Sequence, residues 1–233
     1  MTITENRLPD VARADAGIAL VGYWTVGTPE RQRAAVDAGI AAWKRASWPE
    51  GLLSLNAFVS TDGETVLTYS QWTGDEAIAT FRRGPLTTKL VREVDEAVPG
   101  IERSQPISYR LYRSARRDGA PVPGCVVIVS VDFDEPNEAR QRKWVDTVFE
   151  ALEAEALPHP GGISGHFHIS NDGTRVLNYA EWTTEEAHRD ALERSGQGSV
   201  GSGPKWREVH RFPGVRSSAV KRYHLYRSLA HSS

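Results

Sequence analysis

The sequence predicts an α+β protein built from two tandem ferredoxin-like units. Three observations lead to this prediction. The chain repeats itself once along its length, each copy alternates β-rich and helical segments in the same order, and a short segment rich in Pro, Gly and charge joins the copies. A repeat defines the unit of folding, and here that unit is about 100 residues, the size of a small domain.

The repeat is clearest around one hairpin. STDGETVLTYSQWTGDEA at 60–77 aligns with SNDGTRVLNYAEWTTEEA at 170–187, and the residues they share are mostly Gly, Val, Leu, Tyr and Trp. The copies also end alike, on YRLYRS and YHLYRS, and the tripeptide RQR recurs at 31–33 and 140–142. The predicted organisation is an N-terminal tail (1–17), a first repeat (18–114), a linker (115–124) and a second repeat (125–228).

The elements of each repeat follow one order. The runs ALVGYW (19–24) and CVVIVSV (125–131) predict the first strands. Apolar residues at helical spacing then predict a helix, from Val36, Ile40 and Trp43 in one copy and Val145, Val148, Phe149 and Leu152 in the other. A hairpin around Asp-Gly follows, and then a helix expected to begin at Thr73 or Thr183, where a Glu three residues on would complete a capping box. The closing runs predict the last strands.

The order strand–helix–strand–strand–helix–strand is ferredoxin-like. A four-stranded sheet with both helices on one face leaves its other face apolar and bare. The two units are therefore expected to cover each other sheet to sheet, which gives the duplication a physical reason.

Composition excludes several classes of partner. The chain has 233 residues, 39% hydrophobic and 25% charged, with a net charge of −2 and no basic tract, so neither nucleic acid nor an anionic membrane has an electrostatic footprint. The polar N-terminus does not resemble a signal peptide, and no apolar run approaches the roughly 20 residues of a membrane span. We expect a cytoplasmic protein without a disulfide, because it has one cysteine.

The turn of the second hairpin decides where two histidines point. Residues two apart share a face of a strand, so Asn178 and Trp182 lie on the same face. A three-residue loop in SNDGT would place His166 and His168 on that face as well, whereas a two-residue Asp-Gly turn would shift the register by one and place them opposite. The Ser/Asn-Asp-Gly sequence favours the three-residue loop.

Titratable and amide side chains distinguish the copies. All seven histidines lie in the second half of the chain. The matched positions that differ are Asn56/His166, Phe58/His168, Thr68/Asn178 and Ile78/His188. Residues that only maintain the fold should recur in both copies, so we expect an active pocket in the second repeat and a degenerate one in the first. The shared Trp72 and Trp182 also fit plain core residues, and no third ligand has a spacing that predicts a metal site.

On these residues, SNDGTRVLNYAEWTTEEA above all, the sequence resembles the antibiotic biosynthesis monooxygenases of polyketide pathways. The resemblance covers both repeats. Family members are usually homodimers of one such unit, so the chain is similar to a fused dimer. The resemblance implies an intramolecular dimeric α+β barrel that is monomeric as a pseudo-dimer, with a further homodimer left open.

The resemblance also implies site residues. The family's pocket is lined by a hairpin His, an Asn four residues before a Trp, a helical Tyr and a helical Arg. His168, Asn178, Trp182 and Arg207 match four of these positions, and His188 stands at that of the Tyr. These four are the catalytic candidates, and the expected substrate contacts are His166, His188, Trp206, Trp72 and Arg92.

The implied reaction is oxygenation of an electron-rich polycyclic phenol or anthrone by molecular oxygen, without flavin, haem or metal. A deprotonated substrate can donate an electron to oxygen directly, so the protein needs a base, oxyanion donors and a dry aromatic pocket. His168 is the expected base, and Asn178 and Arg207 would stabilise the enolate and a peroxide, while Trp182 packs against the rings. No glycine-rich nucleotide fingerprint follows a first strand, in agreement with cofactor-free chemistry.

Three other functions stay open. A cyclase or isomerase would use the same enolate stabilisation, and an accessory protein would bind a polyketide without turnover. Haem-degrading relatives use an Asn on the first strand, which neither first strand contains. The loop SGQGSVGSG (195–203) has no counterpart of its length in the first repeat, and its Gly and Ser content predicts either a flexible linker or a lid.

Overall fold

The computed structural model describes residues 3–155 and 159–231. These residues form two compact units: unit 1 holds the residues up to Tyr109 and from Tyr223 onward, and unit 2 holds Arg110–Arg222. The α+β class and the ferredoxin-like order of both repeats are confirmed.

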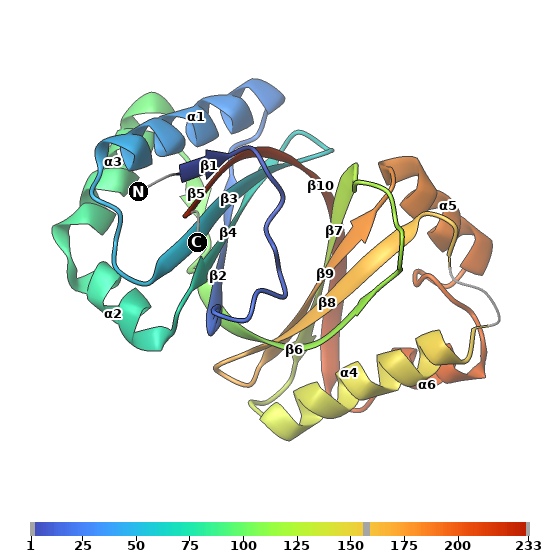
Figure 1. Cartoon of the computed structure of the whole chain (residues 1–233). Coiled ribbons are helices and arrows are strands. Elements are labelled where there is room, and N and C mark those ends of the chain that lie inside the picture. Colours follow the sequence, from blue (N-terminus) through green and yellow to red (C-terminus); the bar gives the residue numbers. More distant parts are fainter. Residues whose placement is uncertain (1–2, 156–158, 232–233) are drawn as a thin grey trace. The chain divides into compact units, whose positions relative to one another are not determined.

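Unit 1 is built on the first repeat (Figure 1). Its strands are ordered β1-β10-β3-β4-β2-β6, with β5 beside β2, and the run β3-β4-β2-β6 is the ferredoxin-like order. Its elements are β1 (Ile3–Glu5), β2 (Ile18–Thr25), α1 (Pro29–Arg45), β3 (Leu52–Ser60), β4 (Thr65–Trp72), α2 (Asp75–Arg83), α3 (Pro85–Ala97), β5 (Glu102–Arg103), the start of β6 (Ile107–Arg116) and the end of β10 (Val215–His231).

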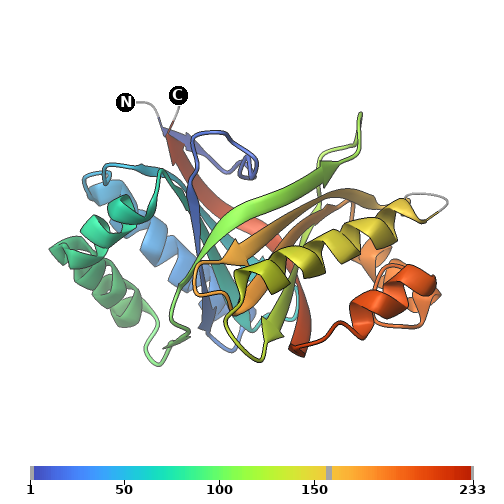
Figure 2. The same cartoon turned by 90° about the horizontal axis from the view of Figure 1, so that it is seen from below.

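Unit 2 is built on the second repeat. Its strands are ordered β6-β8-β9-β7-β10, and α4, α5 and α6 lie over one face of this sheet (Figures 1 and 2). Besides the end of β6 and the start of β10, its elements are β7 (Cys125–Phe133), α4 (Glu138–Glu153), β8 (Gly162–Ser170), β9 (Arg175–Trp182), α5 (Glu185–Ser195) and α6 (Pro204–His210).

Each unit includes part of a strand from the other repeat, and a matched ion pair anchors it. In unit 2, Arg113 on β6 donates to Asp146 of α4 at 2.9 Å. In unit 1, Arg227 on β10 donates to Asp37 of α1 at 3.1 Å. The recurring LYRS and Val-Asp sequences therefore hold an exchanged strand, and the compact units do not coincide with the sequence repeats.

Two segments placed outside the repeats by sequence contribute strands. Ile3–Glu5, within the predicted tail, forms β1 and pairs antiparallel with β10. Strand β6 continues to Arg116, two residues into the predicted linker. Within the described ranges, no helix combines the length and the apolar character that crossing a bilayer requires.

The helix after each hairpin begins later than the capping-box pattern predicted, so the predicted caps were wrong. The backbone N–H of Thr183 donates to the carbonyl of Gly161 at 2.9 Å, which extends the sheet by one residue. Thr184 caps α5 instead, and its hydroxyl accepts from the N–H of Ala187 at 3.1 Å. Thr73 is held in the same way, and the helix after it has no side-chain cap.

Candidate active site

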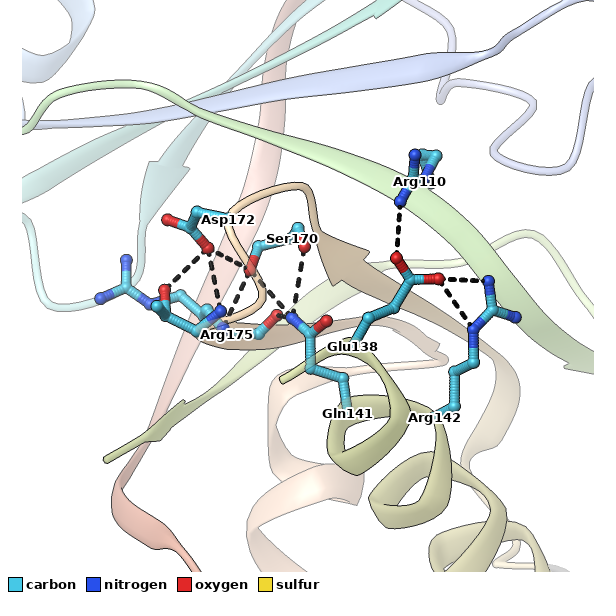
Figure 3. A network of polar contacts seen from close by, with 8 residues as sticks. Arg110, Glu138, Gln141, Arg142, Ser170, Asp172 and Arg175 are labelled. Atoms are coloured by element: carbon cyan, nitrogen blue, oxygen red, sulfur yellow. Dashed lines mark hydrogen bonds and ion pairs between the residues drawn. The ribbon is translucent and has the colours of Figure 1, made fainter. Parts of the chain in front are cut away.

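A polar cluster fixes the turn of the β8–β9 hairpin. Buried Gln141 of α4 donates from Nε2 to Ser170 Oγ at 2.9 Å and to the carbonyl of Arg175 at 2.6 Å (Figure 3). Ser170 Oγ in turn donates to Asp172 Oδ1 at 2.6 Å and accepts from the N–H of Arg175 at 2.9 Å. Gln32, from the first RQR sequence, is buried against the first hairpin in the same way. The glutamine of each RQR sequence therefore holds the turn of its own hairpin through hydrogen bonds.

With these hydrogen bonds, strands β8 and β9 are joined by a four-residue loop, 171–174. The predicted three-residue loop was wrong. The ladder pairs His166 with Tyr179 and His168 with Leu177. The extra loop residue changes the parity of the register, so both histidines lie on the face opposite Asn178. Asp172 stabilises the wider loop by accepting from the N–H and hydroxyl of Thr174 at 3.0 and 2.7 Å.

His166 and His168 belong to a buried polar layer on that opposite face. His166 Nδ1 lies 2.9 Å from Ser114 Oγ, and His168 Nδ1 donates to the carbonyl of His166 at 3.0 Å. Burial, and next the adjacent His166, lower the pKa of His168 to about 4. Neither lines the cavity described below. Nor do the described residues contain a group of three His, Cys, Asp or Glu side chains that could hold a metal ion.

We expect the free energy of unfolding to decrease as the pH falls from about 6.5 towards 4. Burial lowers the folded-state pKa of His168 and of His188 to about 4, below the roughly 6.5 of an unfolded histidine. The unfolded chain therefore binds protons first, and this stabilisation is complete above pH of about 6.5 and lost as the pH falls through the folded pKa. Urea unfolding at several pH values measures the slope.

The variant His168→Phe, which copies Phe58, is the control. It should flatten the pH dependence of stability, by up to about 1.4 kcal/mol for each unit of pKa difference removed. Turnover at pH 7 should stay unchanged, because the side chain lies outside the cavity. A large loss of turnover with normal stability would contradict this placement.

Unit 2 contains a cavity of about 700 Å³ between its sheet and its helices. That volume is within the usual range for small-molecule sites. Its walls are mostly apolar and include Val127, Val129, Phe167, Trp144, Trp182 and Trp206. An aromatic molecule of several rings would be enclosed by apolar and aromatic surface here.

Polar atoms without partners face this apolar space. Asn178 Oδ1 and His159 Nε2 are buried, have no hydrogen-bond partner in the described part of the chain, and belong to cavity-lining residues. Buried polar atoms are nearly always paired, so each such exception requires an explanation. A ligand that donates hydrogen bonds within the cavity would satisfy both atoms.

One wall combines an indole with two imidazoles. The ring of Trp182 lies 6.2 Å from that of His159 and 4.9 Å, edge to face, from that of His188. His188 is 3% exposed, and its Nδ1 accepts from Arg222 Nε at 3.0 Å. Burial, and next Arg222, lower the pKa of His188, so the imidazole is neutral at pH 7.

The cavity includes some predicted residues and leaves others out. Asn178, Trp182, His188 and Trp206 line it. Arg207, predicted beside them, is exposed and does not line it, because α6 turns the adjacent Trp206 inward instead.

The two candidates from the first repeat lie in unit 1. Arg92 is exposed and lies 3.6 Å from Glu96, whereas Trp72 is a fully buried core residue. Sequence reasoning missed His159 and Arg222. For Arg222 a signal existed, since it aligns with Ser108 in the first repeat just as His188 aligns with Ile78.

Aromatic side chains occupy the corresponding region of unit 1. The ring of Phe81 lies 5.5 Å from that of Trp43 and 5.2 Å from that of Trp72. In unit 2 the positions of Trp43 and Phe81 hold Leu152 and Ala191, whereas the position of Trp72 holds Trp182. Smaller side chains therefore leave space in unit 2 where large rings pack in unit 1.

A glycine opens the cavity further. Gly165 pairs with Ala180 in the β8–β9 ladder, and Leu55 occupies the same position opposite Ser70 in unit 1. Gly165 lines the cavity, and a Cβ there would lie 3.5 Å from Asn178 Oδ1. A larger residue would therefore extend into the space beside the unpartnered amide oxygen.

The 195–203 loop forms part of the cavity wall. Ser199 and Val200 line the cavity, and Ser199 Oγ donates to the carbonyl of Gly201 at 2.7 Å and accepts from His210 Nε2 at 2.8 Å. A side chain at Gly201 would clash with Trp206. In unit 1 only Gly84 separates the corresponding helices. These contacts favour the lid over the linker interpretation.

Comparisons with known proteins agree with this architecture. No protein-family model matches the chain. It is 34% identical over 70 residues to the tetracenomycin-F1 monooxygenase of Streptomyces glaucescens, which covers 30% of this chain and 61% of that protein. The match thus spans less than two thirds of that relative's length. The solved structure of an anthrone oxidase-like protein aligns with a TM-score of 0.72 and 14% identity over 94% of this chain and 95% of that one.

A third similarity is with a solved monooxygenase from the gene ActVA-Orf6 of Streptomyces coelicolor, in complex with the ligand nanaomycin D. It is 31% identical over 44% of this chain and 87% of that chain, with a TM-score of 0.33. The fold and cavity define an α+β protein of duplicated ferredoxin-like repeats, with a cavity in unit 2 large enough for a small molecule. The resemblance to the antibiotic biosynthesis monooxygenases found in the sequence is confirmed.

Proposed function

We propose that this protein is a monooxygenase that oxidises an electron-rich polycyclic aromatic, a phenol or anthrone of polyketide type, in the cavity of unit 2. The observation that carries the proposal is an apolar cavity of about 700 Å³ whose lining residues include His159, Asn178 and Trp206, each with a buried polar atom that has no partner among the described residues. The names of the relatives support it, since they are monooxygenases, one of them in complex with a small-molecule ligand.

His159 replaces His168 as the proposed base. Its Nε2 is free to accept a proton, and burial lowers its pKa, so the ring is neutral at pH 7. The carboxylate of Glu155, which also lines the cavity, opposes that shift and would stabilise the imidazolium once the proton has moved. A base of this kind suits a phenol or an anthrone, whose deprotonation produces a delocalised oxyanion.

Asn178 and His188 are the proposed groups around that oxyanion. The amide of Asn178 offers donors as well as the free Oδ1, and the second ring nitrogen of His188 carries its N–H. Donors that are fixed before reaction in a site with little water are worth much more than donors in bulk solvent. Trp182, between the two imidazoles, would pack against the substrate rings.

The reaction balances without an added reductant. His159 takes a proton from the substrate CH₂ group, and the carbanion gives one electron to oxygen. The superoxide and the substrate radical then join in a C–O bond, and the peroxide takes up a proton. The same carbon then loses its second hydrogen as a proton while the O–O bond breaks. The terminal OH leaves with that proton as water, and a carbonyl group remains. One oxygen atom enters the product and the other leaves as water.

We expect purified protein to consume one oxygen molecule for each anthrone converted to the quinone. An oxygen electrode and product chromatography measure both quantities under air and under argon. With ¹⁸O₂, one labelled atom should appear in the product, and activity should not require added flavin or metal. Conversion under argon would indicate a cyclase or isomerase. Binding without any conversion would indicate an accessory protein.

A further inference from the structure

The contact between Arg222 and His188 joins elements that are distant in sequence. Arg222 lies on β10, at the end of unit 2, and His188 lies on α5. The guanidinium Nε donates to His188 Nδ1 at 3.0 Å, and the imidazole is 3% exposed and lines the cavity.

This contact determines the tautomer of the imidazole. Arginine only donates, so Nδ1 must present its lone pair, and the single proton of the neutral ring must be on Nε2. Among the described residues, the hydrogen bond of this ring is the one at Nδ1, so the N–H of Nε2 is left to a cavity ligand. The other titratable group near the ring is His159, while Trp182 packs against it without charge.

The sequence changes both residues together. Ile78 and Ser108 stand at the matched positions of the first repeat, so the polar pair is absent where the matched space is filled by rings. A residue that only maintained the ferredoxin-like fold would be needed in both copies. Arg222 is therefore present in the repeat that also has His188 and the cavity.

We propose that Arg222 is a positioning residue that holds His188 as the Nε2–H tautomer, so that this N–H donates a hydrogen bond to an oxygen atom of the cavity ligand. The proposal rests on the proposed function for the nature of that ligand, an aromatic with hydroxyl or carbonyl oxygens. The tautomer itself does not depend on turnover. Arg222 therefore acts through His188 and not on the substrate.

Nuclear magnetic resonance of ¹⁵N-histidine protein tests the tautomer directly. The His188 signals, assigned by their loss in His188→Ile, should show Nε2–H alone at pH 7. In Arg222→Gln both tautomers should appear, and the titration midpoint should rise from about 4 because a cation beside the ring has been removed. The control Arg216→Gln, an exposed arginine on the same strand, should change neither signal. An Nδ1–H tautomer in the native protein would overturn the proposal.

Ligand binding tests the consequence. The probe is 1,8-dihydroxyanthraquinone, which is already oxidised, and tryptophan fluorescence reports its affinity. Arg222→Gln should weaken binding about tenfold, as expected for one lost hydrogen bond. In the His188→Ile background the same change should have little effect, because the two residues act as one unit. Equal losses in both backgrounds would refute a role through His188.

These outcomes separate the two proposals. If the protein consumes no oxygen with any anthrone, but the tautomer and the binding cycle behave as expected, then the proposed function fails and Arg222 retains its role. If oxygen is consumed and the tautomer is not fixed, Arg222 has no positioning role. Arg222→Lys, which keeps the charge but not the planar donor, should restore the low titration midpoint more fully than the affinity.

Discussion

Asn178→Ala should lower turnover about 10²-fold or more, because it removes a fixed polar group at the position where negative charge develops. The effect should fall mainly on kcat, with a smaller change in KM, since the interaction strengthens as the oxyanion forms. Initial rates of oxygen uptake across a range of anthrone concentrations separate the two constants.

Thr68→Ala is the matched control. Thr68 is the positional partner of Asn178 on the equivalent strand of unit 1, where its hydroxyl donates to the carbonyl of Gly22 at 3.2 Å. A generic cost of disturbing the hairpin should be similar in both variants, and turnover in Thr68→Ala should be nearly normal. Equal losses would mean two working pockets. If turnover falls little in either variant, an accessory protein that binds a polyketide without turnover would be the better interpretation.

Gly165→Leu should weaken ligand binding while the protein stays folded. A Cβ at this position would lie 3.3 Å from Phe167 and 3.5 Å from Asn178, so the leucine side chain would extend into the cavity beside the amide. The change copies Leu55 of unit 1, which occupies the same ladder position. We expect the dissociation constant for 1,8-dihydroxyanthraquinone to rise at least about tenfold, which corresponds to about 1.4 kcal/mol.

The reciprocal variant, Leu55→Ala, tests the other half of the comparison. Leu55 packs against the apolar cluster of unit 1 that includes Trp72 and Phe81, so its truncation should destabilise the protein by about 2 kcal/mol. Ligand affinity should not change. Urea unfolding and fluorescence titration measure the two quantities in both variants. Unchanged affinity in Gly165→Leu would place the ligand outside this cavity.

Local sequence determined the plan of the chain. The repeat, the element order and the restriction of histidine to the second half were all visible, because each depends on residue identity and short-range spacing. The same holds for Asn178 and Trp182, whose shared face follows from the period of two along a single strand. Both residues line the cavity.

Tertiary contacts decided which way several side chains point, which the spacing of residues in the sequence did not determine. The face of His168 depended on a loop whose length is fixed by Gln141, a side chain from another element. Two hairpins whose registers differ by one residue fit the same local sequence, and the hydrogen bonds from this distant amide favour one of them. Whether α6 directs Trp206 or Arg207 inward likewise depends on which face packs, and the burial of Trp206 shows the result.

The composition of the cavity was also decided in three dimensions. Arg222 bonds to His188 from strand β10, and His159 lies beside Trp182 from a loop, so no sequence motif connects either of them to His188. Gly165 and Leu152, which line the space, are smaller than their partners in the first repeat, Leu55 and Trp43. Sequence spacing records order along one strand or helix, whereas a cavity depends on side chains that several elements bring to the same place.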